Sequence, residues 1–509
     1  MKKIFLSSIA ASLLLAVSCQ TDFDNSTEDV VVTSGDANFS KYIALGNSLT
    51  SGFRDNALYI DGQNESYPNL IATQMKRAGG GEFVQPLMAD NNGGLVLGTT
   101  VIQGTKLFIE SFANGSPVLK NVAATPTTSI ATKLTGTINN MGVPGAKSFH
   151  LVAPGYGNIA GVANGTANPY YVRFSTSGTS TVAADAVAQK PTFFSLWIGN
   201  NDVLSYATSG GSGVDQKGNV NPATYGSNDI SDPAVVAGSI KGVLDGLKAA
   251  GSTQGVIANI PYVTSIPFFT TVPYNPLSPA ALGSNLTTLN TNLYGPLKQA
   301  LTAFGAGSRI NLLSATSANP VLIKDTSLPN LSVQLTAALT PSLGAPTAAA
   351  FGQIYGQARQ ATSEDHVLLT ASSVIASVNA GAPAAINING VSYPLENQYV
   401  LTKTEAALVK TAVDAYNSQI ATLATSYGLA FVNANAKMTE LNSMSGIQFN
   451  GVKYTAKFVT GGTFSLDGVH LTGRGYAVVA NEFMKAINSK YRSNLPMVDP
   501  NSYSGVKFP

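Results

Sequence analysis

The stretch Phe193-Phe-Ser-Leu-Trp-Ile-Gly-Asn-Asn-Asp202 decides the fold of this 509-residue chain. Its first six residues are apolar apart from one serine, which favours a β-strand buried on both faces, as in a parallel sheet. The run then ends in a glycine and three polar residues. Because ligands of α/β proteins bind beyond the carboxyl ends of parallel strands, these polar residues are a candidate site. The alternative is an Asx-turn that only closes the strand.

Other segments of the chain repeat this pattern and place helices between the strands. The expected buried strands are residues 41–45, 192–198, 255–260 and 429–432. A helix is predicted over 403–427, where Thr402 and Glu405 form a capping box and Gly428 supplies the stop. Its expected buried face comprises Leu408, Ala412, Tyr416, Ile420 and Leu423. Strand, helix and strand in succession predict a three-layer α/β/α sandwich around a central parallel sheet, carrying large insertions.

Two short blocks at opposite ends of the chain contain the groups of a serine hydrolase. Gly46-Asn47-Ser48-Leu49 follows the strand at 41–45, and Asp467-Gly-Val-His470 lies near the C-terminus. A serine hydroxyl needs an imidazole to take its proton and a carboxylate to orient that imidazole. The chain has three histidines, and only His470 has a carboxylate three residues before it. Ser48 could also be an ordinary residue at a strand-to-turn junction.

Glycines in a third block leave backbone N–H groups open to a close ligand. The block is Asn140-Met-Gly-Val-Pro-Gly145-Ala146, and a simple tight turn is the alternative interpretation.

In chain order, Gly-Asn-Ser-Leu, Asn-x-x-x-x-Gly, Gly-x-Asn-Asp and Asp-x-x-His resemble the four blocks of the SGNH hydrolases, also called GDSL esterases and lipases. The resemblance implies a flavodoxin-like α/β fold, with Ser48 as nucleophile, His470 as base and Asp467 as the residue that orients the base. It also implies an oxyanion hole built from the Ser48 N–H, the Gly145 N–H and the Asn201 side-chain amide. Each such donor can contribute about 3 kcal/mol when charge develops on the carbonyl oxygen.

The chain departs from the family pattern at Asn47, where the family usually has Asp. An amide can keep the local backbone hydrogen bonds of a carboxylate but brings no charge. We therefore expect an altered pH response and retained chemistry.

The sequence lacks the signature motifs of several other enzyme classes. No serine lies in a Gly-x-Ser-x-Gly nucleophile elbow, and Ala146 stands where a phosphate-binding loop would need lysine. Neither a Cys pair, nor His-x-x-x-His, nor a complete calcium loop is found. We expect neither metal nor cofactor.

The first residues of the chain predict that the protein is located in the cell envelope. A basic start and an apolar run over residues 4–17 are typical of a secretory signal, and fourteen residues are fewer than the roughly 20 that span a bilayer. Leu15-Ala-Val-Ser-Cys19 resembles a bacterial lipobox, which implies cleavage after residue 18 and lipidation of Cys19, the only cysteine. The polar residues 19–38 are expected to be a flexible tether, and 39–509 the hydrolase domain. Together these features predict a lipoprotein, in the outer membrane.

Charge excludes one class of partner. Removal of residues 1–18 takes away two of 29 basic residues and none of 27 acidic ones, so the mature chain is balanced at 27 against 27. Such a balance argues against nucleic acid, and against electrostatic docking on a membrane. Contact with a membrane would come from the lipid anchor.

Two insertions are expected within the hydrolase domain, at about residues 79–137 and 262–400. The first is predicted to be β-rich. The second contains Phe268, Phe269 and Tyr274, which could line an acyl or sugar pocket or belong to a subdomain that packs on itself. A separate hairpin is expected around Asn450-Gly451, bordering the cleft.

The sequence therefore predicts an envelope-anchored serine hydrolase that cleaves carboxylic esters of a small molecule, lipid or glycan through an acyl-enzyme on Ser48. Two alternatives remain open at this point. One is a polysaccharide O-acetyl esterase. The other is a non-catalytic surface lipoprotein that binds glycans on the same fold.

Overall fold

A five-stranded parallel sheet lies at the centre of the computed structural model, which describes residues 31–113 and 115–509. In the sheet the strands lie in the order β13 (Ala430–Val432), β8 (Gly255–Ala258), β7 (Phe193–Trp197), β1 (Tyr42–Gly46) and β6 (Asn140–Gly142). Counted along the chain, this is the order 2-1-3-4-5 of flavodoxin-like doubly wound sheets. The strand order reverses between β1 and β7, where Gly46 pairs with Trp197. In such sheets the ligand site lies beyond this switch point.

Four of the five strands were predicted from their apolar runs, and the fifth was not. β6 has only three residues and contains an asparagine, so no hydrophobic pattern marks it. The preceding Asn139 fixes it instead: its side chain donates to the Tyr42 carbonyl at 3.2 Å and accepts from the Val84 N–H at 2.8 Å.

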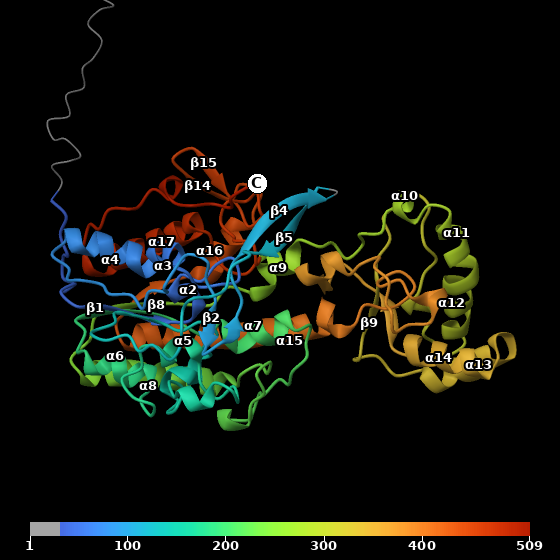
Figure 1. Cartoon of the computed structure of the whole chain (residues 1–509), viewed down its shortest axis with the longest axis horizontal. Coiled ribbons are helices and arrows are strands. Elements are labelled where there is room, and N and C mark those ends of the chain that lie inside the picture. Colours follow the sequence, from blue (N-terminus) through green and yellow to red (C-terminus); the bar gives the residue numbers. More distant parts are fainter. Residues whose placement is uncertain (1–30, 114) are drawn as a thin grey trace, which may run out of the picture.

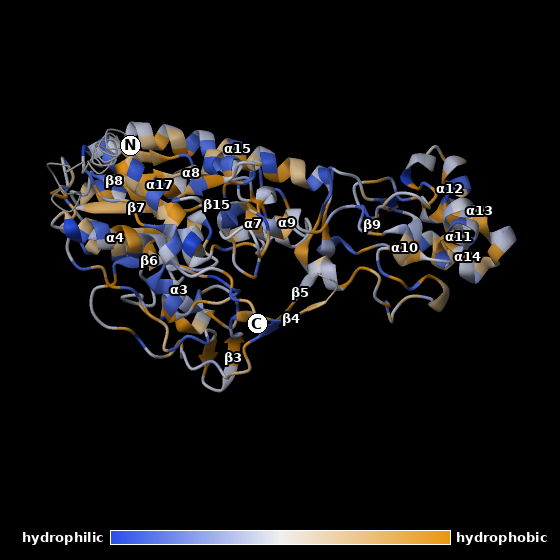
Figure 2. Cartoon of the chain, turned by 90° about the horizontal axis from the view of Figure 1, so that it is seen from above, coloured by the Kyte–Doolittle hydropathy of each residue, from blue (hydrophilic) through white to orange (hydrophobic). Residues whose placement is uncertain are grey.

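Helices cover both faces of the sheet (Figure 1). On one face lie α3 (Ile60–Asn64), α4 (Tyr67–Arg77), α16 (Ala434–Leu441) and α17 (Gly473–Tyr491). On the other lie α5 (Pro169–Val172), α6 (Val182–Ala188), α8 (Pro233–Ala249) and α15 (Lys403–Ser426). The strands between them are strongly hydrophobic (Figure 2), as strands buried on both faces must be. The chain is thus a mixed α/β protein compatible with the expected sandwich.

Helix α15 confirms the predicted capping box and the predicted burial of Ala412, Tyr416 and Ile420, but not that of Leu408. Thr402 N–H donates to the Glu405 carboxylate at 2.7 Å, as the motif requires. Leu408, expected inside, is 36% exposed. The buried residues are Val409, Ala412, Val413, Tyr416, Ile420 and Ala424. The stripe is rotated because α15 packs mainly against α8 and α7 (Asn201–Thr208).

The second insertion forms a lobe with its own hydrophobic core, which extends from Leu277 to Val400 (Figure 1). Its helices are α10 (Pro279–Leu282), α11 (Asn285–Leu289), α12 (Gly295–Thr302), α13 (Ser332–Leu343) and α14 (Ala345–Tyr355). Its strands are β9 (Leu322–Lys324), β10 (Ala358–Gln360), β11 (His366–Val367) and β12 (Val400–Leu401). The insertion was expected from residue 262, but Val263, Ile266 and Phe269, the last in α9 (Pro267–Thr270), belong to the main core. We call residues 277–400 the second lobe.

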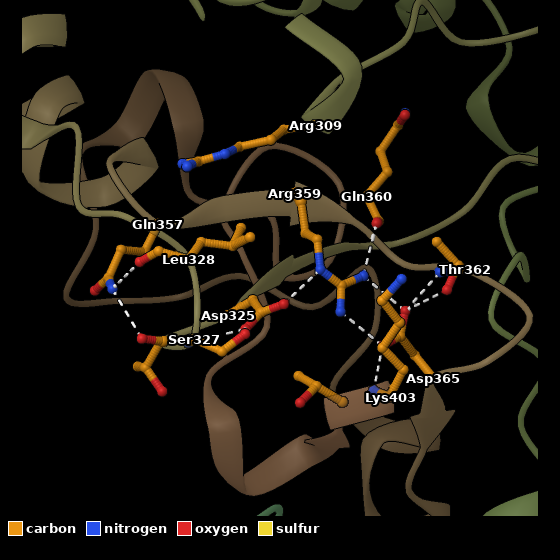
Figure 3. Close-up of polar contacts among 12 residues, drawn as sticks. Arg309, Asp325, Ser327, Leu328, Gln357, Arg359, Gln360, Thr362, Asp365 and Lys403 are labelled. Atoms are coloured by element: carbon orange, nitrogen blue, oxygen red, sulfur yellow. Dashed lines mark hydrogen bonds and ion pairs between the residues drawn. The ribbon is translucent and has the colours of Figure 1, made fainter. Parts of the chain in front are cut away.

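A buried ion-pair network joins the second lobe to α15 (Figure 3). The guanidinium of Arg359 donates two hydrogen bonds to Asp365, at 2.6 and 2.7 Å, and one to Asp325 at 2.6 Å. Asp365 in turn accepts the backbone N–H of Lys403 at 2.9 Å, at the first turn of α15. A carboxylate at that position satisfies a free helical N–H and is favoured by the helix dipole.

The first insertion, predicted to be β-rich over residues 79–137, contains two hairpins between residues 95 and 121. They are β2 (Leu95–Leu97) with β3 (Thr100–Gln103), and β4 (Leu107–Ala113) with β5 (Ser116–Asn121). The hairpin predicted near the cleft is also present, as β14 (Ile447–Phe449) and β15 (Val452–Tyr454). Asn450 and Gly451 have φ of 46° and 77°, the left-handed pair of a tight hairpin turn.

Part of the predicted tether, residues 19–30, lies outside the described residues. Cys19 and the signal segment lie outside the described residues, but residues 31–38 are part of the fold. The Asp36 N–H donates to the Tyr491 carbonyl at 2.7 Å, and Asn38 N–H to the Gln254 side chain at 2.8 Å. Local composition resembles that of a linker, and these long-range bonds override it. Among the described residues, none of the helices has the length and hydrophobicity needed to cross a membrane.

Candidate active site

Ser48 lies just beyond the switch point of the sheet. β1 ends at Gly46, and Ser48 is the first residue of α2 (Ser48–Ser51). A Cβ at position 46 would collide with the Thr50 side chain and the Trp197 carbonyl, so only glycine fits this sharp strand-to-helix turn. The Ser48 side chain is held at the carboxyl edge of the sheet.

Asn47 keeps the backbone hydrogen bond expected of it and adds another. Its side-chain oxygen accepts the Leu49 N–H at 3.0 Å, which caps α2. Its amide donates to the Asn200 side chain at 3.3 Å, a bond that an ionised carboxylate could not donate. Asn47 and Asn200 thus link the ends of β1 and β7.

Ser48, His470 and Asp467 form a continuous chain of hydrogen bonds. His470 Nε2 lies 2.9 Å from Ser48 Oγ, and His470 Nδ1 lies 2.9 Å from Asp467 Oδ2. The predicted nucleophile, base and orienting acid are therefore brought together although Ser48 and His470 are 422 residues apart in sequence. With this geometry the imidazole can take the serine proton while the carboxylate stabilises the imidazolium.

The Asp467 carboxylate is buried among donors. Oδ1 accepts the backbone N–H groups of His470 and Val469 at 2.8 and 2.9 Å, and Oδ2 accepts that of Asn56 at 2.9 Å. Burial acts to raise the pKa of Asp467, but the His470 imidazole and these hydrogen bonds outweigh it and hold the pKa well below its ordinary value. Asp467 is therefore ionised when the base must become an imidazolium.

A turn that was not predicted holds the loop of residues 465–470 in place. Asp55 and Asn56 both have positive φ, 51° and 60°, an uncommon pair for residues other than glycine. The turn carries the Asn56 N–H to Asp467, and Asp55 Oδ1 accepts the Leu466 N–H at 3.1 Å. Asp55 N–H also donates to Ser465 Oγ at 3.0 Å. Burial raises the pKa of Asp55, against the opposing hydrogen bonds from Tyr59 and Leu466. We call residues 54–57 the clamp turn.

The predicted oxyanion-hole residues Ser48, Gly145 and Asn201 follow the carboxyl ends of β1, β6 and β7. Gly145 has φ of 81°, and within the described residues its N–H has no acceptor. One amide hydrogen of Asn201 is bonded to the Ala146 carbonyl at 2.9 Å, which fixes the orientation of that amide. Buried Asp202 accepts both the N–H and the hydroxyl of Ser148, at 2.8 and 2.9 Å, and so fastens the loop that follows Gly145.

An apolar cavity of about 120 Å³ opens beside the serine. Ser48, Asn201 and His470 line it together with residues of β7, β13, α16 and α17. Its main apolar residues are Trp197, Leu204, Ile266, Val432, Met438, Leu441, Phe464, Val478, Val479 and Phe483. The hairpin β14–β15 contributes Ile447, so it does border the cleft as predicted.

The aromatic residues expected to line an acyl pocket lie elsewhere. Phe269 is buried in the main core, and Tyr274 packs against the core of the second lobe. Phe268 supports the loop of residues 465–470 from outside the cavity, since its N–H donates to the Gly468 carbonyl at 2.9 Å. The segment after β8 does border the cavity, but through Pro261, Val263 and Ile266 rather than through these aromatic residues.

The other two histidines are not alternatives to His470. His150 Nδ1 accepts the Lys147 N–H at 3.0 Å, and burial, with the Lys147 charge, lowers the pKa of His150 to about 4. His366 lies beside the Phe269 carbonyl, and burial lowers its pKa. In the described part of the chain, no group of three or more His, Cys, Asp or Glu side chains could hold a metal ion.

The chain matches no protein-family model, and no curated protein matches it in sequence.

Proposed function

We propose that the protein is a serine ester hydrolase that works through an acyl-enzyme on Ser48. The observation that carries the proposal is the continuous Ser48–His470–Asp467 hydrogen-bond chain, with both links at 2.9 Å. The position of Ser48 at the switch point of a doubly wound sheet supports it independently, and so does the resemblance to the SGNH blocks.

The reaction follows from the roles of these groups. Ser48 Oγ attacks the ester carbonyl while His470 Nε2 takes the serine proton, and Asp467 stabilises the imidazolium. The N–H groups of Ser48 and Gly145 and the amide of Asn201 stabilise the negative charge on the carbonyl oxygen. The ester C–O bond breaks and the alcohol leaves with the proton from His470. Water then attacks the acyl-enzyme with His470 again as base, which releases the acid and restores Ser48.

A fluorophosphonate probe tests the nucleophile directly. We expect the probe to label Ser48, as located by mass spectrometry, and we expect Ser48→Ala and His470→Ala to lose both labelling and ester turnover. Ser51→Ala is a matched control, because it removes a buried hydroxyl three residues away that donates to the Ser48 carbonyl. Labelling that persists in Ser48→Ala would refute the assignment. A folded wild type that neither reacts nor hydrolyses esters would instead favour a glycan-binding protein.

We further propose that lipidated Cys19 anchors the protein in the cell envelope, in the outer membrane. The lipobox-like residues 15–19 support this proposal. Cys19→Ala should move the protein from the membrane fraction to the soluble fraction without loss of activity on a soluble ester. Incorporation of labelled palmitate that survives the substitution would contradict it.

A further inference from the structure

We propose that the substrate of this site is an ester with a linear hydrocarbon acyl chain, and that this chain lies in the apolar cavity between α16 and α17. The inference deepens the proposed function and rests on it. It selects one of the ester classes that the sequence leaves open, and it names the residues that set chain length.

The cavity begins at the reacting groups. Ser48, Asn201 and His470 are part of its lining, so a carbonyl bound at Ser48 places its substituent at the cavity entrance. A single water needs roughly 10–15 Å³, and the cavity of about 120 Å³ therefore has room for a chain of several methylenes. An acetyl group would leave most of this space unfilled.

The lining is suited to hydrocarbon and poorly suited to sugar. Met438 and Leu441 project from α16, and Val479 and Phe483 from α17. The two charged residues of the lining, Lys437 and Glu482, are paired with each other at 3.3 Å. Because most of the lining side chains are apolar, a sugar ring would bury most of its hydroxyls without a hydrogen-bond partner, which carries a free-energy cost.

The acyl part is assigned to the cavity because it is the part that stays. When Ser48 Oγ forms its bond to the carbonyl carbon, the alcohol departs with the proton, while the acyl chain remains attached until water cleaves the intermediate. A cavity between α16 and α17 can hold the retained acyl chain after the alcohol has left.

The first experiment is a series of p-nitrophenyl esters from acetate to dodecanoate. Burial of a methylene contributes about 0.8 kcal/mol, so kcat/KM should rise about fourfold per methylene until the chain fills the cavity. A matched series of alkyl acetates varies the alcohol instead and should show no such climb. A wild type that prefers acetate overturns the inference and favours deacetylation of a polysaccharide. A climb only in the alkyl acetates overturns the assignment to the acyl chain.

The second experiment fills the cavity from α16. Met438, 7% exposed, lines the cavity, whereas the next residue, Thr439, faces solvent on the same helix. Met438→Trp should lower the octanoate-to-acetate ratio of kcat/KM at least tenfold, and Thr439→Trp should keep the wild-type ratio. Met438→Ala, which enlarges the cavity, should move the optimum to longer chains. Unchanged profiles in both Met438 variants would refute the role of this residue and of the cavity.

A binding experiment separates the inference from the proposed function. Calorimetry with sodium dodecanoate on Ser48→Ala requires no turnover. We expect binding that is lost when Met438→Trp is added and kept when Thr439→Trp is added. If the wild type hydrolyses no ester but dodecanoate binds in this pattern, the cavity is a binding site for hydrocarbon chains and the hydrolase proposal fails. If esters are hydrolysed and dodecanoate does not bind, the cavity assignment fails alone.

Discussion

At the scale of single residues, the proposed reactivity of the Ser48 hydroxyl depends on the groups that hold His470 and Asp467 in position. Asp467 accepts five hydrogen bonds, from His470 twice and from Val469, Ser465 and Asn56. A carboxylate with so many donors stays ionised and cannot rotate. The imidazole is therefore oriented before the substrate arrives, which is how an active site avoids reorganisation during the reaction.

The amide of Asn201 should matter only after charge has developed. Asn201→Ala should lower kcat by roughly 10²-fold with little change in KM, because it removes a donor aimed at the transition state. Steady-state kinetics on one ester measures this. A change confined to KM would place Asn201 in ground-state binding instead.

The clamp turn should act on catalysis through Asp467. Asp55→Ala removes the acceptor of the Leu466 N–H and should lower kcat roughly ten- to hundredfold at unchanged KM, since small displacements of reacting groups are costly. Asp55→Asn keeps an acceptor oxygen and should retain most of the activity. Circular dichroism checks that both variants are folded. Equal kcat in the wild type and Asp55→Ala would show that the turn does not position the carboxylate.

At the scale of elements, the junction between β1 and α2 is the most constrained part of the site. Gly46→Ala would push a Cβ into the Trp197 carbonyl and force β1 away from β7. We expect a loss of about 3 kcal/mol in the free energy of unfolding, at the upper end for overpacking, together with loss of activity. Gly238→Ala in α8 is the control, because its Cβ meets nothing within 4 Å and alanine favours a helix. Urea denaturation of both variants provides the measurement.

The sequence predicts some of the secondary-structure elements and some of the site residues, but not others. Four strands, α15 and the hairpin around Asn450-Gly451 could be predicted because local patterns of apolar residues and turn residues specify them. β6 could not, because side-chain bonds of Asn139 fix it rather than its own hydrophobicity. Ser48, Asp467 and His470 follow from short blocks with distinctive chemistry. For the clamp turn the sequence offers one hint, which is residue types that tolerate positive φ. The turn could not be predicted because its bonds to Leu466 and Asp467 connect positions 411 residues apart. The cavity was missed because its lining comes from ordinary amphipathic helices.

At the scale of the whole molecule, the second lobe has its own core and is fastened through the Arg359 network. Burial acts to raise the pKa of Asp365, but the hydrogen bonds and charge of Arg359 outweigh it, and the pKa lies below its ordinary value. A carboxyl group whose pKa falls on folding stabilises the folded state above its unfolded pKa. That stabilisation is lost as the pH falls through the folded value.

Asp365→Asn should therefore be most harmful at neutral pH. It breaks a buried ion pair and leaves Arg359 with Asp325 alone, so we expect a loss of about 3 kcal/mol at pH 7. The difference from the wild type should narrow as the pH falls through the folded-state pKa of Asp365. Thermal unfolding across this pH range measures both effects. A difference that stays constant with pH would exclude ionised Asp365 as the source of the stabilisation.

The bonds of residues 31–38 place the beginning of the described chain at the edge of the sheet opposite Ser48. These residues join the fold at the amino ends of the strands, beside Gln254 and Tyr491, whereas Ser48 and Asn201 follow the carboxyl ends. A five-residue strand such as β7 separates the two edges by about 17 Å. A support attached to the chain upstream would therefore be joined to the sheet at the edge opposite Ser48. In a tethered esterase of this shape, the Ser48 site would face away from the support. Its esters would arrive from the side opposite the support.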